Sequence, residues 1–129
     1  MSDHGGKAVI LAVDDTPENL DVVKGALGDE YVIKAAINGM IALKIAEKAP
    51  PDLILLDIQM PGMDGFEVMN RLQAIKAMQA VPVIFLTGES DNKVKQRAYE
   101  MGARGFVTKP IDGSKLKDTV AGELAKARS

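Results

Sequence analysis

The sequence predicts an α/β domain in which a five-stranded parallel sheet lies between two layers of helices. Five short apolar runs alternate along the chain with five longer stretches that carry apolar residues at helical spacing. Within the runs, polar and apolar residues alternate little, which is typical of strands buried on both faces of a parallel sheet. Right-handed crossovers between such strands place helices on both faces of the sheet.

Each apolar run is short enough to be a strand. The last run is the least apolar of the five, because it holds a glycine and a threonine among its four residues. The five expected strands are Ala8–Val13, Tyr31–Ala36, Leu53–Leu56, Val81–Leu86 and Gly105–Thr108. Parallel strands need long connections, and the stretches between these runs supply them.

The intervening stretches are expected to be helices because each has an apolar stripe. Pro17 suits a first helical turn, Pro50 and Pro51 stop the second helix, and Gly102 is placed to end the fourth. Asp64 is placed to cap the third helix, and Asp91 and Asp112 precede the last two. The stripes are Leu20, Val23 and Leu27; Ile41, Ile45 and Ala49; Phe66, Met69 and Leu72; Val94, Ala98 and Met101; and Leu116, Val120 and Leu124.

The composition fits one globular domain and excludes several classes of protein. Of the 129 residues, 47% are hydrophobic and 26% are charged, an ordinary balance. A net charge of −2 argues against a general nucleic-acid binder. The lack of cysteine and the single histidine, His4, exclude thiol catalysis, zinc sites of the usual kind and a Ser–His–Asp triad. With no membrane-spanning run and no signal peptide, we expect a cytoplasmic protein.

Polar side chains follow four of the five expected strands. Asp14 and Asp15 follow the first, Asp57 the third, Thr87 the fourth and Lys109 the fifth. In open α/β sheets, ligands collect beyond the carboxyl ends of the strands, so we expect these side chains to form one site. Three close carboxylates repel one another unless a cation joins them, and Mg²⁺ prefers oxygen ligands. The Lys109 ammonium can neutralise a carboxylate or bind a phosphate oxygen.

Taken one by one, these residues have simpler interpretations. Asp14 and Asp15 can cap the helix that follows, Asp57 can cap a loop, and Thr87 can belong to an ordinary turn. Their joint placement at strand ends favours a functional site. The sequence has no P-loop motif, no dinucleotide-binding glycine motif and no nucleophile elbow, which argues against those enzyme classes.

Four motifs, in this order and on these strand ends, resemble the receiver domain of two-component response regulators. They are Val13-Asp14-Asp15, the stretch from Leu55 to Gly65, Phe85-Leu86-Thr87-Gly88, and Phe106-Val107-Thr108-Lys109-Pro110. The resemblance covers about residues 7–126. It implies a flavodoxin-like, doubly wound (βα)5 three-layer sandwich with strand order 2-1-3-4-5. We expect a flexible tail at residues 1–6 and a single receiver domain at residues 7–127.

The resemblance implies a role for each carboxylate. Asp57 is the expected phosphoacceptor, which attacks a phosphohistidine on a partner kinase. Asp15 and Asp57 are the expected direct ligands of Mg²⁺, with the backbone carbonyl of Gln59 as a third. Asp14 is expected to act on the cation mainly through water.

The resemblance also implies how the site senses the phosphoryl group. Thr87 and Lys109 are expected to bond it, and a cis peptide bond before Pro110 is expected to aim Lys109 into the site. Phe106 stands where the family often has a switch tyrosine, and should move inward when Thr87 moves. The fourth helix, fifth strand and fifth helix form the expected output face. Gln59 and Glu89 occupy positions that tune hydrolysis of the acyl phosphate.

The leading hypothesis is a phosphorylation-dependent signalling module rather than an enzyme with an external substrate. Its expected partners are a sensor histidine kinase or phosphotransfer protein, an output domain or downstream protein, and a second copy of the chain in a phosphorylation-linked homodimer. The main alternative is a receiver-like interaction module that works without phosphorylation. A small Mg²⁺-dependent phosphohydrolase is disfavoured, because Gln59 stands where such an enzyme would want a second aspartate as acid and base.

Overall fold

Five parallel strands form one sheet in the computed structural model, which describes residues 6–88 and 92–128. The sheet order is β2-β1-β3-β4-β5, so the expected doubly wound, flavodoxin-like arrangement is confirmed. The sheet order reverses between β1 and β3, where such folds bind their ligands. The strands are β1 (Val9–Val13), β2 (Val32–Ala36), β3 (Leu53–Asp57), β4 (Val83–Thr87) and β5 (Gly105–Thr108).

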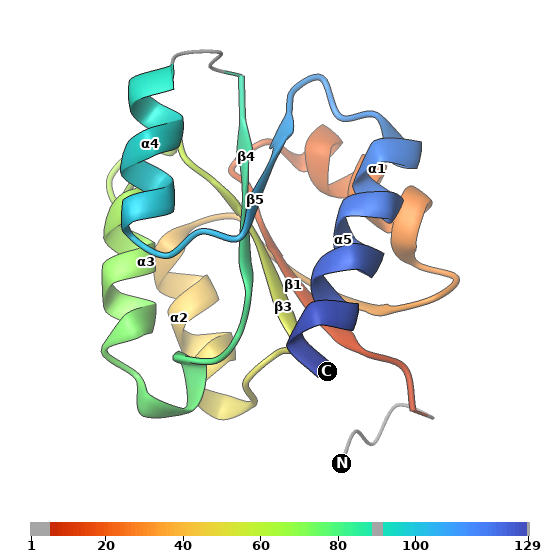
Figure 1. The fold of residues 1–129 in the computed structure, drawn as a ribbon, viewed down its shortest axis with the longest axis horizontal. Coiled ribbons are helices and arrows are strands. Elements are labelled where there is room, and N and C mark those ends of the chain that lie inside the picture. The colour runs from red at the N-terminus through yellow and green to blue at the C-terminus, as the bar shows by residue number, and fades with distance from the viewer. Residues whose placement is uncertain (1–5, 89–91, 129) are drawn as a thin grey trace.

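Helices cover both faces of the sheet. Figure 1 shows α1 and α5 on one face and α2, α3 and α4 on the other. A short 3₁₀ helix, η1, precedes β4 and was not expected from the apolar pattern. The bounds are α1 (Pro17–Leu27), α2 (Gly39–Lys48), α3 (Gly65–Gln73), η1 (Lys76–Met78), α4 (Asn92–Glu100) and α5 (Gly113–Arg128). None of the helices in the described part of the chain is long and apolar enough to cross a bilayer.

The sheet divides the core in two, because successive side chains of a strand point to opposite faces. In β1, Ile10 and Ala12 join the cluster beneath α1 and α5, whereas Leu11 and Val13 join the cluster beneath α2, α3 and α4. All residues of β1, β3 and β4 are buried, as expected. In β2, by contrast, four of the five residues are only half-buried, because this strand lies at an edge of the sheet.

Most of the expected helix ends are confirmed. The Asp64 side chain accepts a hydrogen bond from the backbone N–H of Glu67, and Asp112 accepts one from that of Ser114, each at 2.9 Å. Gly102 follows α4 with a φ of 103°, a conformation that favours glycine. Asp91 and nearly all of the expected N-terminal tail lie outside the described residues.

The expected apolar stripe of α2 was wrong at two of its three positions: Ile45 packs against the core, but Ile41 and Ala49 are exposed. Ile41 is 38% exposed, and the buried residues are instead Gly39, Ala42, Leu43 and Ala46. The reason is close packing against α3: a side-chain carbon on Gly39 would lie 2.6 Å from Val68 and 2.9 Å from the sulfur of Met63. Small residues permit that approach, so the bulkier Ile41 lies further out.

Gly65 is expected to be sensitive to substitution, because its α-carbon lies against the end of β3. A side-chain carbon at Gly65 would lie 2.3 Å from the carbonyl oxygen of Asp57 and 2.8 Å from the α-carbon of Ile58. Since backbone atoms must shift, Gly65→Ala should lower the free energy of unfolding by about 1–3 kcal/mol in urea denaturation. The control is Gly122→Ala, where nothing lies within 4 Å and a small gain is expected. Equal stability of the Gly65→Ala variant and the unmodified chain would contradict this account.

Candidate functional site

Three charged side chains lie on the same face of the sheet, at the carboxyl ends of its strands, because side chains alternate between the two faces along each strand. Asp57 continues the alternation of Leu53 and Leu55, which face α1 and α5, and Asp14 continues that of Ile10 and Ala12. Lys109 follows Val107, which faces the same layer. Its backbone N–H bonds to the carbonyl of Thr87 at 2.8 Å, so the ladder between β4 and β5 extends to Lys109.

A double ion pair joins these three residues. The Lys109 ammonium lies 3.0 Å from Asp14 Oδ2 and 3.0 Å from Asp57 Oδ1. Both aspartates are almost fully buried, whereas the Lys109 side chain is 21% exposed. One cation therefore bridges two buried carboxylates across the ends of β1, β3 and β5.

The carboxylate of Asp14 has partners on both oxygens. Oδ1 accepts from the backbone N–H of Thr16 at 2.9 Å, and Oδ2 accepts from the side-chain amide of Asn19 at 3.2 Å as well as from Lys109. Asp14 thus also helps to cap α1, as the simpler interpretation of this residue predicts, because the N–H that it binds belongs to Thr16, the residue before the first residue of α1. Sequence reasoning missed Asn19, although polar residues three positions into a helix often reach back toward its start.

Asp57 is held on one oxygen only. Oδ1 contacts Lys109 and accepts from the backbone N–H of Gln59 at 3.2 Å. Oδ2 is buried, and none of the described residues gives it a hydrogen bond. Buried carboxylate oxygens normally have partners, so an orphan of this kind points to a function.

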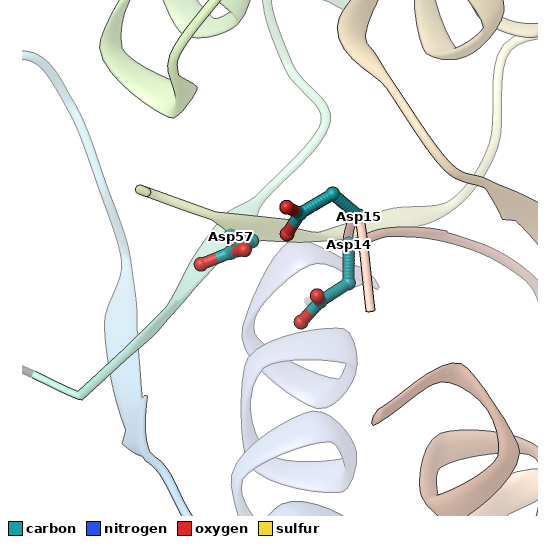
Figure 2. A group of neighbouring side chains, drawn as sticks. All are labelled: Asp14, Asp15 and Asp57. Carbon is teal, nitrogen blue, oxygen red and sulfur yellow. The ribbon is translucent and has the colours of Figure 1, made fainter. Parts of the chain in front are cut away.

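A divalent cation fits this acidic cluster. Asp14, Asp15 and Asp57 can each offer an oxygen, and the three oxygens lie within 4.8 Å of one another. Figure 2 shows that the carboxylate of the exposed Asp15 is turned toward that of Asp57. Three negatively charged carboxylates thus lie close to the one positive charge of Lys109, which leaves the described cluster with an excess of negative charge. All of its donors are oxygen atoms, which are the ligands that Mg²⁺ prefers.

Burial and the sharing of one ammonium together shift the pKa values of Asp57 and Lys109. Burial raises the pKa of Asp57 to about 6, although Lys109 and the Gln59 N–H favour the charged form. The negative charge of Asp14 adds to the rise. Burial acts to lower the pKa of Lys109, but its bonds to Asp57 and Asp14 outweigh this and raise it. Lys109 is stabilised by two carboxylates, whereas each carboxylate has only a share of one ammonium.

The remaining predicted residues lie near the cluster or outside the described part. The Thr87 side chain is buried at the end of β4, next to β3 in the sheet. The peptide bond between Lys109 and Pro110 is cis, as expected. Glu89 lies outside the described residues, and the metal-binding role of the Gln59 carbonyl stays a prediction.

A row of aromatic rings runs from β4 to α4. Phe85 contacts Phe66 and Phe106, with ring centroids 5.6 and 6.2 Å apart, and Phe106 meets Tyr99 edge-on at 4.9 Å. The Arg97 guanidinium lies 4.1 Å from the ring centroid of Phe66. Phe106 was singled out from the sequence, but the contacts of Arg97 with Phe66 and of Tyr99 with Phe106 were not foreseen, because no sequence pattern relates α4 to these rings.

Comparisons with known proteins identify related chains. A model of the response regulator receiver domain family matches residues 10–121. A probable cyclic di-GMP phosphodiesterase of Vibrio cholerae is 42% identical over 123 residues, which are 95% of this chain and 28% of that protein. Response regulator PleD of Caulobacter vibrioides is 40% identical over 106 residues, 81% of this chain and 23% of that protein. The chain thus spans about a quarter of these two relatives.

A solved structure also resembles this chain in fold and in sequence. The chemotaxis protein CheY4 of Vibrio cholerae superposes with a TM-score of 0.87 at 33% sequence identity, covering 91% of this chain and 98% of that chain.

The raised pKa of Asp57 predicts that its charge destabilises the metal-free fold. The group binds a proton up to about pH 6 in the folded chain and only to about pH 4 when unfolded, so stability falls as pH rises through that interval. In EDTA, Asp57→Asn should therefore be more stable than the unmodified chain by about 1–2 kcal/mol above pH 7. Urea denaturation should show this difference shrinking toward pH 5. The exposed Asp21→Asn variant is the control, and a pH-independent difference at Asp57 would contradict the assignment.

Proposed function

Because the chain belongs to the response regulator receiver domain family of two-component signalling, we propose that it is a phosphorylation-dependent switch whose phosphoacceptor is Asp57. The observation that carries the proposal is the buried Oδ2 of Asp57, which no described residue engages. Its lone pairs are available for attack, while Lys109 and the Gln59 N–H hold Oδ1. Asp14, by contrast, accepts hydrogen bonds on both oxygens and is a poor nucleophile.

The proposed reaction transfers one phosphoryl group. Asp57 Oδ2 attacks the phosphorus of a phosphohistidine on the partner, an O–P bond forms, and the P–N bond breaks. The electron pair of that bond stays on the leaving imidazole nitrogen, and the product is an acyl phosphate on Asp57. Attack by water on the same phosphorus later breaks the new O–P bond, which restores the carboxylate and releases inorganic phosphate. Such transfers depend mainly on positioning and on neutralisation of charge.

The residues around Asp57 supply the positioning. The Lys109 ammonium lies at hydrogen-bond distance from Asp57. It can therefore move to bind the negatively charged oxygens of a phosphoryl group on that residue. Asp15 and Asp57, with the backbone carbonyl of Gln59, are the proposed ligands of Mg²⁺, and Asp14 acts through water. When bound, Mg²⁺ supplies positive charge that offsets the carboxylates and the phosphoryl oxygens.

Thr87 and Phe106 are the proposed switch. The Thr87 hydroxyl moves toward the phosphoryl group and bonds it. Phe106 then moves inward to fill the space that Thr87 has left. The half-buried Phe106 touches both Phe85 and Tyr99, so its movement would be passed to α4. The proposed output surface is the face formed by α4, β5 and α5. A change of charge at one site that biases a two-state element is a common design for such switches.

The proposed partners follow from this role. They are a sensor histidine kinase or phosphotransfer protein upstream and an output domain or protein downstream, with a phosphorylation-linked homodimer as one form of output. We propose no external substrate turnover, no direct binding to nucleic acid or membrane, and a cytoplasmic location. Gln59 and Glu89 are the proposed regulators of acyl-phosphate hydrolysis.

Phosphorylation of Asp57 can be tested without the cognate kinase. Incubation with acetyl phosphate and Mg²⁺ should add a single phosphoryl group, detected by intact-mass spectrometry. Asp57→Asn should remove the adduct, because the amide is not a nucleophile of this kind, and chelation of Mg²⁺ should prevent it. The exposed Asp21→Asn variant should be labelled normally. Undiminished labelling of Asp57→Asn would overturn the assignment. A folded chain that neither reacts nor binds beryllofluoride would favour the phosphorylation-independent module.

Movement of Phe106 should be visible at one of the two tyrosines. Tyr99 contacts Phe106 edge-on, whereas Tyr31 packs on the opposite side of the sheet with the cluster beneath α1 and α5. Beryllofluoride with Mg²⁺ should therefore shift the ring resonances of Tyr99 in NMR spectra and leave those of Tyr31 in place. Phe106→Leu should reduce the Tyr99 shift. Equal shifts at both tyrosines would argue against a path through Phe106.

A further inference from the structure

Asn19 connects the first turn of α1 to the charged cluster. Its side-chain amide donates to Asp14 Oδ2 at 3.2 Å, the same oxygen that lies 3.0 Å from the Lys109 ammonium. Asn19 itself is only half-buried, and its backbone N–H bonds to the carbonyl of Thr16 at 3.1 Å. The helix therefore presents a neutral donor to a buried carboxylate that also depends on a cation.

The proposed phosphoryl transfer places a competing demand on Lys109. A phosphoryl group on Asp57 adds negative oxygens within reach of the ammonium, and charge-assisted bonds to such oxygens are strong. As Lys109 turns toward them, its bond to Asp14 weakens. Asp14 has no exposed surface, and a buried charge that loses a partner is costly unless other donors remain.

We infer that Asn19 is a positioning residue for phosphoryl transfer, which keeps Asp14 hydrogen-bonded while Lys109 turns to the phosphoryl group. This inference rests on the proposed function. The donor on Asn19 belongs to α1 and stays in place when Lys109 moves. Without it, Asp14 depends more strongly on Lys109, and the ammonium is held back from the phosphoryl oxygens.

A purely structural role would have different consequences. Asn19 and the Thr16 N–H both bond Asp14, so the contact also attaches the start of α1 to the end of β1. Loss of a structural contact would lower the free energy of unfolding and would weaken all ligands of the site alike. Loss of the positioning role should separate the cation from the phosphoryl group. A site that binds Mg²⁺ normally should then bind a phosphoryl analogue poorly.

The test measures two affinities by isothermal titration calorimetry. One is the Kd for Mg²⁺ alone, and the other is the Kd for beryllofluoride in saturating Mg²⁺, where beryllofluoride is the probe for the phosphoryl group. Asn19→Ala should weaken beryllofluoride about ten-fold, in line with one bond to a charged group, and leave Mg²⁺ binding unchanged or tighter. Asn19→Asp should weaken beryllofluoride further, because its carboxylate attracts Lys109 and repels the analogue.

The control variant is Asn70→Ala, which removes an exposed asparagine from α3 and should change neither affinity. Urea denaturation of both variants checks that each is folded. Asn19→Asp brings a second carboxylate close to that of Asp14, whereas Asn19→Ala adds no charge, so the Asn19→Ala result decides the test if Asn19→Asp does not fold. Equal weakening of Mg²⁺ and beryllofluoride, or no change in either variant, would overturn the role of Asn19 alone. Failure of the unmodified chain to bind beryllofluoride would overturn the proposed function, and the inference with it.

Discussion

The bridge from Lys109 to Asp14 and Asp57 is the interaction on which the site depends. Two carboxylates are buried at the end of a sheet that is otherwise apolar, and a buried charge is tolerated only when it is paired. The pairing uses the ends of β1, β3 and β5. The sheet edge is thus held together partly by the same ammonium that the proposed chemistry needs.

The sharing of one cation leaves the cluster short of positive charge. Asp14 is satisfied by Thr16 and Asn19 as well as by Lys109, whereas Asp57 retains an oxygen to which none of the described residues donates. The molecule therefore tolerates an incompletely paired carboxylate at the position proposed to react. Stability sacrificed at a functional site in this way is common in proteins.

Much of the fold and of the site could be predicted from the sequence, because short apolar runs and the polar residues that follow them are local features. The five strands, and the charged residues Asp14, Asp57 and Lys109 at or just after the ends of three of them, follow from short apolar runs and the residues after them. The buried face of α2 could not be predicted, since it depends on how closely Gly39 approaches Met63 and Val68. The contact from Asn19 was also hidden, because only the tertiary structure shows which donors reach a buried carboxylate.

The aromatic row gives α4 two separate attachments to the rest of the molecule. Arg97 and Tyr99 lie two residues apart on α4, and residues at that spacing point in widely different directions around a helix. Arg97 lies over the ring of Phe66, and Tyr99 meets the ring of Phe106. The rings of Phe66 and Phe106 both touch Phe85. A rotation of α4 about its own axis cannot improve both contacts at once. The helix therefore has a defined rotational setting, and a displacement of Phe106 would change that setting rather than simply loosen the helix.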